Sequence, residues 1–329
     1  MIRKLREQNV ETSDRDLLFE NVACNLCGAT DPKPVLTGRD LLTGIPGAFR
    51  LVRCRQCGLI YQDPRPIAAS IQDTYGAGYG PRTTHPGKRR RMEIYQQRII
   101  GKLSGMAGRT YGQRRLLDVG CGAGDLLKLA RQRSWEVVGV EPYGIIEAPD
   151  DALVVTDLWD RSLNEYTFDL VVMSHALEHM REPSRALGRI RNLIAPAGLL
   201  YIAAPNIASP EARLFRGRWY HLDLPRHLYH FTPKTLRTML RNTGFRVTRV
   251  QYLPWFSLAQ NLRNVVHPPR RQRVGPAHPR RVGRLDALAT TVFAASLTVS
   301  DAMGRVLPGE IMEMYARPDF STEELVAHE

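Results

Sequence analysis

From residue 114 to near the end of the chain, short apolar runs alternate with stretches of helical spacing. The runs are "LLDV", "WEVVGVEP", "ALVVTDLWD", "FDLVVMSH" and "GLLYIAAPN", with "FRVTRVQYL" and "EIMEMYARP" as the sixth and seventh. Strands that alternate with helices predict an α/β fold with a parallel, doubly wound sheet. Ligands bind such sheets at the carboxyl ends of the strands, so we expect the functional site in the loops that follow these runs.

The chain has 329 residues, of which 43% are hydrophobic, enough for one large domain and a small one. We predict an N-terminal segment with a cysteine-rich unit over 1–66, a linker with cap helices over 67–113 and a large domain over 114–329. Within the large domain, 262–308 is expected to be a basic loop and helical insert. No apolar run is long enough to span a bilayer, and the polar N-terminus lacks a signal-peptide core, which favours the cytoplasm.

Four of the five cysteines form two C-x-x-C-G knuckles, with Cys24 and Cys27 in "CNLCG" and Cys54 and Cys57 in "CRQCG". Each spacing lets two thiolates hold one ion, and the glycine permits the turn. Two such pairs complete a closed site typical of structural Zn²⁺, and without a secretory signal they favour a metal over disulfides. The segment resembles a zinc ribbon, in which the ion organises the fold and does not catalyse. A redox pair and unrelated buried thiols are the alternatives.

The first strand is followed by "DVGCGAG", an acid and three glycines in the pattern D-x-G-x-G-x-G. A glycine-rich turn alone is weak evidence, because many nucleotide-binding folds use one. Here the acid precedes the glycines, which differs from the G-x-G-x-x-G of dinucleotide enzymes. With the acids after later strands, residues from about 70 to 317 resemble the class I S-adenosylmethionine (SAM) methyltransferases. The resemblance implies a Rossmann-like seven-stranded sheet that binds SAM.

The resemblance assigns cofactor roles by position. In that family the glycines let the backbone approach the methionine part of SAM, and the acid before them lies near its amino group. The acid after the second strand, here Glu141, holds the ribose hydroxyls, and "MSHALEH" matches the motif where the fourth strand faces the transferred methyl. The implied cofactor-binding residues are Asp118, Gly120, Cys121, Gly122, Gly124, Glu141, Pro142, Asp157, Leu158 and Ser174. A helix cap is the alternative for Asp157, and "PYGIIEAPDD" after Glu141 is more broken than the helix usually found there.

Two tyrosines in "YGAGY" precede the large domain. Related enzymes often have paired tyrosines here that close over the cofactor, so the resemblance implies that role for Tyr75 and Tyr79. Packing within a linker is the alternative.

Methyl transfer from SAM is an in-line displacement from an activated donor, so the enzyme must mainly align the reacting atoms. A hydroxyl acceptor also benefits from a general base with a pKa near the working pH, which suits histidine. His175 directly follows the fourth strand and His179 lies four residues later, with Glu178 between them. At that spacing we expect the two histidines to share one helix face.

The segment "WYHLDLPRHLYHFT", residues 219–232, holds three of the nine histidines. It lies between the fifth strand and a helix for which Thr232 and Pro233 predict the N-cap and first turn. Because loops after strand ends form the active face, we expect this segment and "SHALEHM" to converge on one pocket. The predicted catalytic residues are His175 and His227, and further substrate-side candidates are His179, Trp219, His221, Asp223, Arg226 and His230. For His179 and His230, a purely structural hydrogen-bonded histidine is the alternative.

The motifs "LEH", "PN" and "PRHL-HF" together resemble a large methyltransferase subgroup, many of whose members methylate sugars or other small-molecule hydroxyls. The resemblance implies an acceptor hydroxyl on a sugar, a glycan precursor or another small molecule. A more distant group, the small-RNA 2′-O-methyltransferases, has an acid-x-x-Glu-His run and a later histidine that bind a divalent ion. Here His175 replaces the first acid, and Glu178, His179 and His227 would supply the remaining ligands of a second metal.

The net charge is +13, with arginine-rich runs at 87–92 and 267–284. This charge favours anionic partners, although a solvated basic surface explains it equally well. An RNA methyltransferase is therefore one alternative. The basic runs argue against it, because they lack the interleaved aromatic residues that a surface for single-stranded RNA would need. A non-catalytic scaffold is another. The helix-spaced stretch 285–303 could join the basic loop in contacting the inner membrane face or a lipid-linked acceptor, and the alternative is a helix over the core or a dimer face. The oligomeric state stays open.

Overall fold

The computed structural model describes the chain in ten segments, which are 17–75, 86–107, 113–143, 148–253, 257–266, 290–291, 293–295, 297–298, 301 and 308–319. Tyr79, the basic run 267–284 and most of the predicted insert lie outside these residues. Among the described helices, none is long and apolar enough to cross a membrane.

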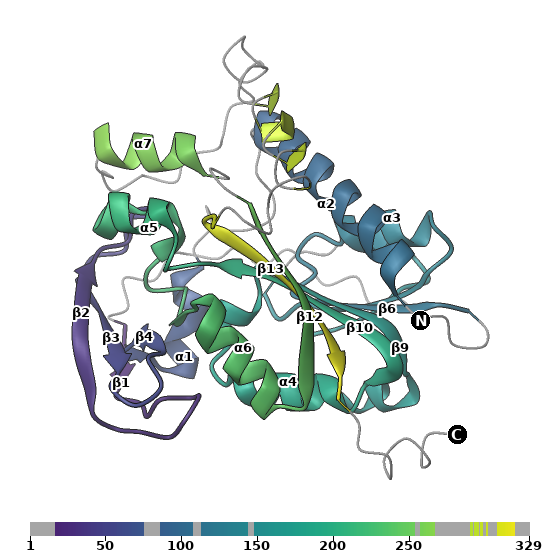
Figure 1. Cartoon of the computed structure of the whole chain (residues 1–329), viewed down its shortest axis with the longest axis horizontal. Helices are drawn as coiled ribbons and strands as arrows, with labels where there is room; N and C mark the ends of the chain where they lie inside the picture. Colours follow the sequence, from purple (N-terminus) through teal and green to yellow (C-terminus); the bar gives the residue numbers. More distant parts are fainter. Residues whose placement is uncertain are drawn as a thin grey trace.

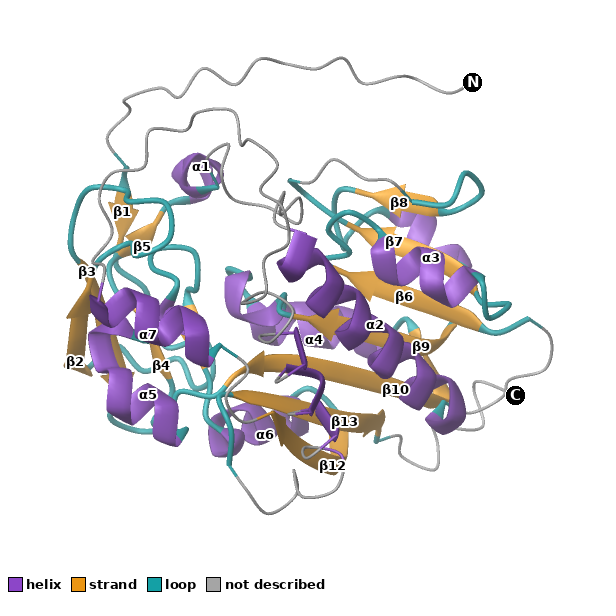
Figure 2. Cartoon of the chain, turned by 90° about the horizontal axis from the view of Figure 1, so that it is seen from above, coloured by secondary structure: helices purple, strands orange, loops and turns teal. Residues whose placement is uncertain are grey.

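All seven predicted strands form one sheet (Figures 1 and 2). They are β6 (Arg115–Val119), β7 (Glu136–Val140), β8 (Leu153–Val155), β9 (Phe168–Ser174), β10 (Ile194–Pro205), β12 (Phe245–Leu253) and β13 (Ile311–Pro318). Their order is β12-β13-β10-β9-β6-β7-β8. This Rossmann-like sheet is mixed and not wholly parallel as the sequence predicted, because β13 runs antiparallel to both β10 and β12. β12 ends at the carboxyl edge of the sheet and β13 begins at that same edge, so β13 runs in the opposite direction.

Helices cover both faces of this sheet (Figure 2). α2 (Pro86–Met106) and α3 (Asp125–Arg131) pack on one face, and α4 (Pro183–Arg191) and α6 (Pro233–Asn242) pack on the other. Thr232 caps α6 as predicted, because its side chain accepts from the Thr235 amide. The apolar side chains of α4 and α6 recur three and four residues apart, so they form one stripe that faces the sheet.

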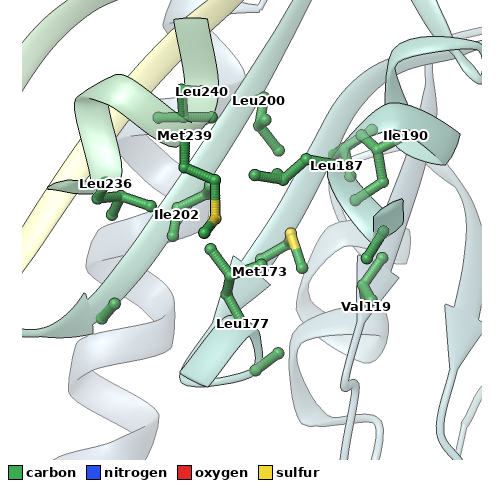
Figure 3. Close-up of a cluster of buried hydrophobic side chains, with 14 of the residues drawn as sticks. Val119, Met173, Leu177, Leu187, Ile190, Leu200, Ile202, Leu236, Met239 and Leu240 are labelled. Carbon is green, nitrogen blue, oxygen red and sulfur yellow. The ribbon is translucent and has the colours of Figure 1, made fainter. Parts of the chain in front are cut away.

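Figure 3 shows the core between α4, α6 and the sheet. Its labelled side chains, all nearly or fully buried, are Val119, Met173, Leu177, Leu187, Ile190, Leu200, Ile202, Leu236, Met239 and Leu240. On the opposite face, the described part of the insert adds Phe293 and Leu297 to the core around α2. That part of the insert therefore covers the core.

The N-terminal cysteine-rich unit forms short antiparallel strands, at the left in Figure 1. β1 (Phe19–Glu20) pairs with β5 (Arg65–Pro66), while β2 (Pro32–Gly38), β3 (Phe49–Cys54) and β4 (Ile60–Gln62) belong to a second sheet. The fourth strand of that sheet is β11 (Tyr229–His230), which pairs with β4. Part of the histidine-rich segment 219–232 is thus a strand of the N-terminal sheet.

A buried ion pair fastens α2 to the sheet. Arg98 donates to both carboxylate oxygens of Glu313 on β13, at 2.7 and 3.2 Å, and Glu313 is fully buried. Asp301 and the Tyr201 hydroxyl complete the cluster. Because a carboxylate at this depth is stable only when it is paired, α2 depends on Arg98 for its position.

Replacing Arg98 with methionine should lower the free energy of unfolding by about 3–5 kcal/mol, because Glu313 would be left as a buried charge without its cation. Urea titration of the full chain measures this change. The matched control on the same helix is Arg90→Met, which removes an exposed pair with Glu93 and should change stability by less than about 1 kcal/mol. Equal effects of the two variants would contradict the role given to Arg98.

Candidate functional site

The two predicted cysteine knuckles come together as one four-sulfur cluster. Cys24 Sγ lies 3.4 Å from Cys57 Sγ, and Cys27 Sγ lies 3.5 Å from Cys54 Sγ. The four sulfurs lie within 4.8 Å of one another. A tetrahedral zinc ion with Zn–S bonds of about 2.3 Å separates its sulfurs by about 3.8 Å. The residues present therefore fit a four-thiolate zinc ion.

At the sheet's switch point, the glycine-rich turn follows β6. Gly120, Gly122 and Gly124 all have positive φ. A Cβ on residue 120 would lie 2.8 Å from the Cβ of Ala176, so only glycine fits both the conformation and the space. The turn is consequently packed closely against the segment that follows β9.

Two acids flank this turn. The Gly122 amide donates to Glu141 Oε2 at 2.8 Å, and the Tyr143 amide donates to Glu141 Oε1 at 3.0 Å. Asp118 is buried at the end of β6, where desolvation and the charge of Glu141 raise its pKa to about 7. The two carboxylates thus lie on either side of the turn, one partly exposed and one buried.

The remaining predicted cofactor residues occupy the same edge of the sheet. Asp157 is exposed and accepts from the Trp159 amide at 3.1 Å, whereas Leu158 is buried beside it. Pro142 is exposed directly after Glu141. Cys121 is buried against Gly139 of β7, where a Cβ would lie 2.8 Å from its sulfur, and burial raises the pKa of its thiol. Ser174 ends β9 half-buried. Cys121 is therefore placed as a packing residue of the turn.

Tyr75 connects the cofactor side to the histidines. Its ring stacks on Tyr143 with centroids 5.1 Å apart, and its hydroxyl lies 3.0 Å from His179 Nδ1. Burial raises the pKa of Tyr75, so the hydroxyl keeps its proton at neutral pH. Sequence reasoning missed Tyr143, because it sits in a broken loop with no periodicity.

The predicted helix face shared by His175 and His179 does not form. His175 has a positive φ of 56°, and only a short 3₁₀ turn, Leu177–His179, follows it. The two imidazoles consequently point to different neighbours. His175 Nδ1 lies 3.5 Å from Glu178 Oε1, and its ring lies parallel to that of His221 with centroids 6.1 Å apart.

Segments 174–180 and 219–232 nevertheless converge. The Leu228 amide donates to the Glu178 carbonyl at 2.9 Å, and the rings of His179 and His227 meet edge-on with centroids 4.5 Å apart. His227 Nδ1 lies 2.9 Å from the His221 carbonyl, and His179 Nδ1 lies 3.2 Å from the Arg226 carbonyl. A carbonyl can only accept, so His227 Nδ1 carries the proton and its Nε2 keeps a lone pair, whereas His179 Nδ1 faces both a carbonyl and the Tyr75 hydroxyl.

One buried carboxylate serves this cluster. Burial alone would raise the pKa of Glu178, but the neighbouring imidazoles of His175 and His227 lower it to about 2. Burial and the charge of His227 lower the pKa of His179 to about 4, and the same causes lower that of His230 to about 3. At neutral pH, Glu178 is therefore ionised while His179 and His230 are neutral.

Arg226 is fully buried and holds the loop in place. Its guanidinium pairs with Asp223 and with Asp40 of the cysteine-rich unit, both at 2.7 Å, and it donates to the Thr74 carbonyl at 3.0 Å. Although burial opposes ionisation, Arg226 lowers the pKa of Asp40 to about 2. This geometry supports a positioning role for Arg226.

A second buried carboxylate, Glu310, holds the other end of the loop. It accepts from Trp219 Nε1 at 3.2 Å, from Asn261 Nδ2 at 3.1 Å and from the Ser257 amide. Burial raises its pKa to about 7. His221 Nε2 lies 2.7 Å from the Ser257 hydroxyl. Sequence reasoning missed Glu310 and Asp40, since neither belongs to a motif.

Known methyltransferases are similar to this chain in sequence and in structure. Residues 89–250 match a family model described as "Methyltransferase domain". A ubiquinone biosynthesis O-methyltransferase from Pseudomonas paraeruginosa is 27% identical over 180 residues, which cover 49% of this chain and 75% of that protein. One from Aeromonas salmonicida is 27% identical over 190 residues, covering 50% and 76%. A solved SAM-dependent methyltransferase from Archaeoglobus fulgidus is 20% identical, with a TM-score of 0.42 over 68% of this chain and 93% of that one.

The strand order, the glycine-rich turn with its two acids and the family-model match lead to one conclusion. The chain carries a class I SAM-dependent methyltransferase domain and is a SAM-dependent methyltransferase.

Proposed function

We propose that the protein transfers a methyl group from SAM to a hydroxyl of a sugar, a glycan precursor or another small molecule. The observation that carries the proposal is the buried histidine cluster at the end of β9, beside the glycine-rich turn. Its imidazoles are oriented by backbone carbonyls and surround one ionised carboxylate. The relatives named as O-methyltransferases support an oxygen acceptor.

SAM supplies an activated methyl on a positively charged sulfur. We place it against Gly120–Gly124, with Glu141 at the ribose, Asp157 and Leu158 at the adenine, and Tyr75 alongside. Asp118 lies buried behind the turn. The protein's main task is then alignment of the acceptor oxygen with the methyl carbon.

His227 is the residue that we assign as general base. Its Nε2 keeps a lone pair and lies 3.7 Å from Asp223 Oδ2 and 4.0 Å from Glu178 Oε1. A proton taken from the acceptor hydroxyl would form an imidazolium between two carboxylates, which stabilise that charge in a buried site. His175, on the turn after β9, is placed to orient the acceptor.

The same atoms favour a second interpretation of the cluster. Glu178, His179 and His227 offer ligand atoms within 4.8 Å of one another, and each histidine is oriented by a carbonyl on Nδ1, as metal-binding histidines are. Neither carboxylate oxygen of Glu178 meets hydrogen-bond geometry within the described part of the chain. A divalent cation there would polarise the acceptor oxygen. His227 Nε2 cannot bind an ion and accept a proton together, so the two roles are exclusive.

His227→Ala should lower turnover by about 10²- to 10⁴-fold, because the acceptor proton loses its base. SAM affinity should stay near the wild-type value, since this ring packs against His179 and is held by the His221 carbonyl on the histidine loop. Turnover is followed with labelled SAM on a panel of sugars, small-molecule hydroxyls and bulk RNA, and calorimetry gives SAM affinity. His230→Gln is the matched control on the same loop and should keep most of its turnover. Unchanged turnover in His227→Ala, or labelling confined to RNA, would contradict the proposal.

Metal content separates the two interpretations of the cluster. With His227 as base, the purified chain should hold one zinc ion, lost in Cys54→Ser and kept in Glu178→Gln. Two ions per chain, one of which is lost in Glu178→Gln, would make His227 a ligand instead. Elemental analysis by mass spectrometry after dialysis measures both.

Removing the zinc should reduce methyl transfer far more than SAM binding. β4 pairs with β11, and Asp40 pairs with Arg226, so loss of order in the cysteine-rich unit reaches the histidine loop but not the glycine-rich turn. Chelation under mild conditions, with turnover and SAM calorimetry as readouts, tests this. Parallel loss of both properties would indicate global unfolding.

Two buried histidines should make the fold less stable as the pH falls below about 6.5, whereas Asp118 and Glu310, whose pKa values are raised to about 7, act in the opposite direction. His179 and His230 have pKa values of about 4 and 3 in the folded chain, against about 6.5 when unfolded. Between these values the unfolded state binds more protons, so stability falls as pH falls. At pH 5 the loss is roughly 2 kcal/mol per histidine. Urea unfolding at pH 7.5 and 5 measures it by comparison with His179→Asn, whose stability at pH 5 relative to pH 7.5 should exceed that of the wild type by about this amount; an equal pH dependence in the two proteins would contradict the assignment.

A further inference from the structure

The helix α7 (Leu258–Val266) turns its apolar side outward. Leu258, Leu262, Val265 and Val266 are 38%, 51%, 45% and 67% exposed and form one stripe along the helix. The side that faces the protein is polar, and its one fully buried residue is Asn261. Surface helices normally bury their apolar stripe, so this inverted arrangement requires an explanation.

The buried side of α7 is fixed by specific polar contacts. Asn261 Oδ1 accepts from the Tyr220 amide at 2.7 Å, and its Nδ2 donates to Glu310. Ser257, just before the helix, bonds to Glu310 and His221. These buried bonds would be broken if the helix rotated, so the apolar stripe is held outward.

Arginines surround the stripe. Arg263 is exposed on α7 itself, and Arg218 donates to the Asn264 and Val265 carbonyls at the end of the helix. The neighbouring α5 (Pro210–Phe215) lies beside α7 in both overall views (Figures 1 and 2) and adds exposed Arg213 and the 74% exposed Leu214. The acid on α5, Glu211, is buried. The described residues of α5, α7 and 216–218 therefore present apolar and cationic groups without an exposed carboxylate.

We propose that one face of the molecule docks on an anionic lipid surface. This α5–α7 face consists of Leu214, Leu258, Leu262, Val265 and Val266 with Arg213, Arg218 and Arg263. Exposed leucine and valine enter the headgroup boundary, while arginine side chains meet lipid phosphates. Charge decides against a second copy of this chain, because two such faces would bring like charges together. The charge also stays positive further along the chain, since 267–284 has six arginines and no acid.

Flotation of the full chain with vesicles tests the proposal without any methyl acceptor. The chain should float with phosphatidylcholine vesicles that contain phosphatidylglycerol and stay behind with pure phosphatidylcholine. The double variant Leu262→Asp with Val266→Asp should have a partition coefficient onto these vesicles at least about tenfold lower, because two apolar anchors become anionic. SAM calorimetry on the same variant shows whether the methyltransferase domain remains folded.

The matched control replaces two equally exposed apolar residues on other elements, Leu18→Asp with Met92→Asp. It should float like the wild type. Failure of the wild type to float, or undiminished flotation of the α7 variant, would overturn the proposal. A third outcome would overturn the proposal in favour of a second copy of the chain. In that case the wild type would not float but would form a dimer in sedimentation velocity, and the α7 variant would be a monomer. None of these outcomes depends on the acceptor hydroxyl.

Discussion

A single guanidinium, that of Arg226, joins the three parts of the molecule that must meet for the site to exist. It pairs with Asp40 of the cysteine-rich unit and Asp223 of its own loop, and it reaches the carbonyl of Thr74, one residue before Tyr75. Its two terminal nitrogens each donate to one oxygen of Asp40, a two-point contact that the single nitrogen of lysine does not reproduce. Three buried charges are tolerable only while all are present and paired. The position of the histidine loop, and of Tyr75 between cofactor side and acceptor side, therefore follows from this one contact.

The electrostatics of the histidine cluster follow from its burial. Water is largely excluded, so a charge is stable only beside an opposite charge, and the ionised carboxylate of Glu178 lies near the rings of His175 and His227. The His221 carbonyl decides which nitrogen of His227 carries the proton. In the proposed reaction the cluster accepts one proton. The cysteine-rich unit and the histidine loop hold the cluster beside the end of β9.

The sheet and its glycine-rich turn could be predicted because they leave local signals. Apolar runs, positive-φ glycines and a capped helix at Thr232 each depend on neighbours in sequence. The failures are long-range or conformational. His175 and His179 have helical spacing, but a left-handed residue and a 3₁₀ turn separate their rings. Asp40 and Glu310 act through partners far along the chain. The strand character of Tyr229–His230 depends on an edge supplied by β4. No periodicity records such contacts. Tyr79 and the basic run 267–284 stay predictions.

The pairing of β4 with β11 also bears on how the chain folds during synthesis. Roughly 170 residues separate the two strands, so the N-terminal sheet emerges from the ribosome long before its last strand exists. During that interval the edge of β4 stays open, and an open strand edge is a template for wrong pairing. Zinc captured early by the four cysteines would hold β3 and β4 in register over this period. A zinc ion bound there would stabilise the N-terminal sheet until β11 has been synthesised.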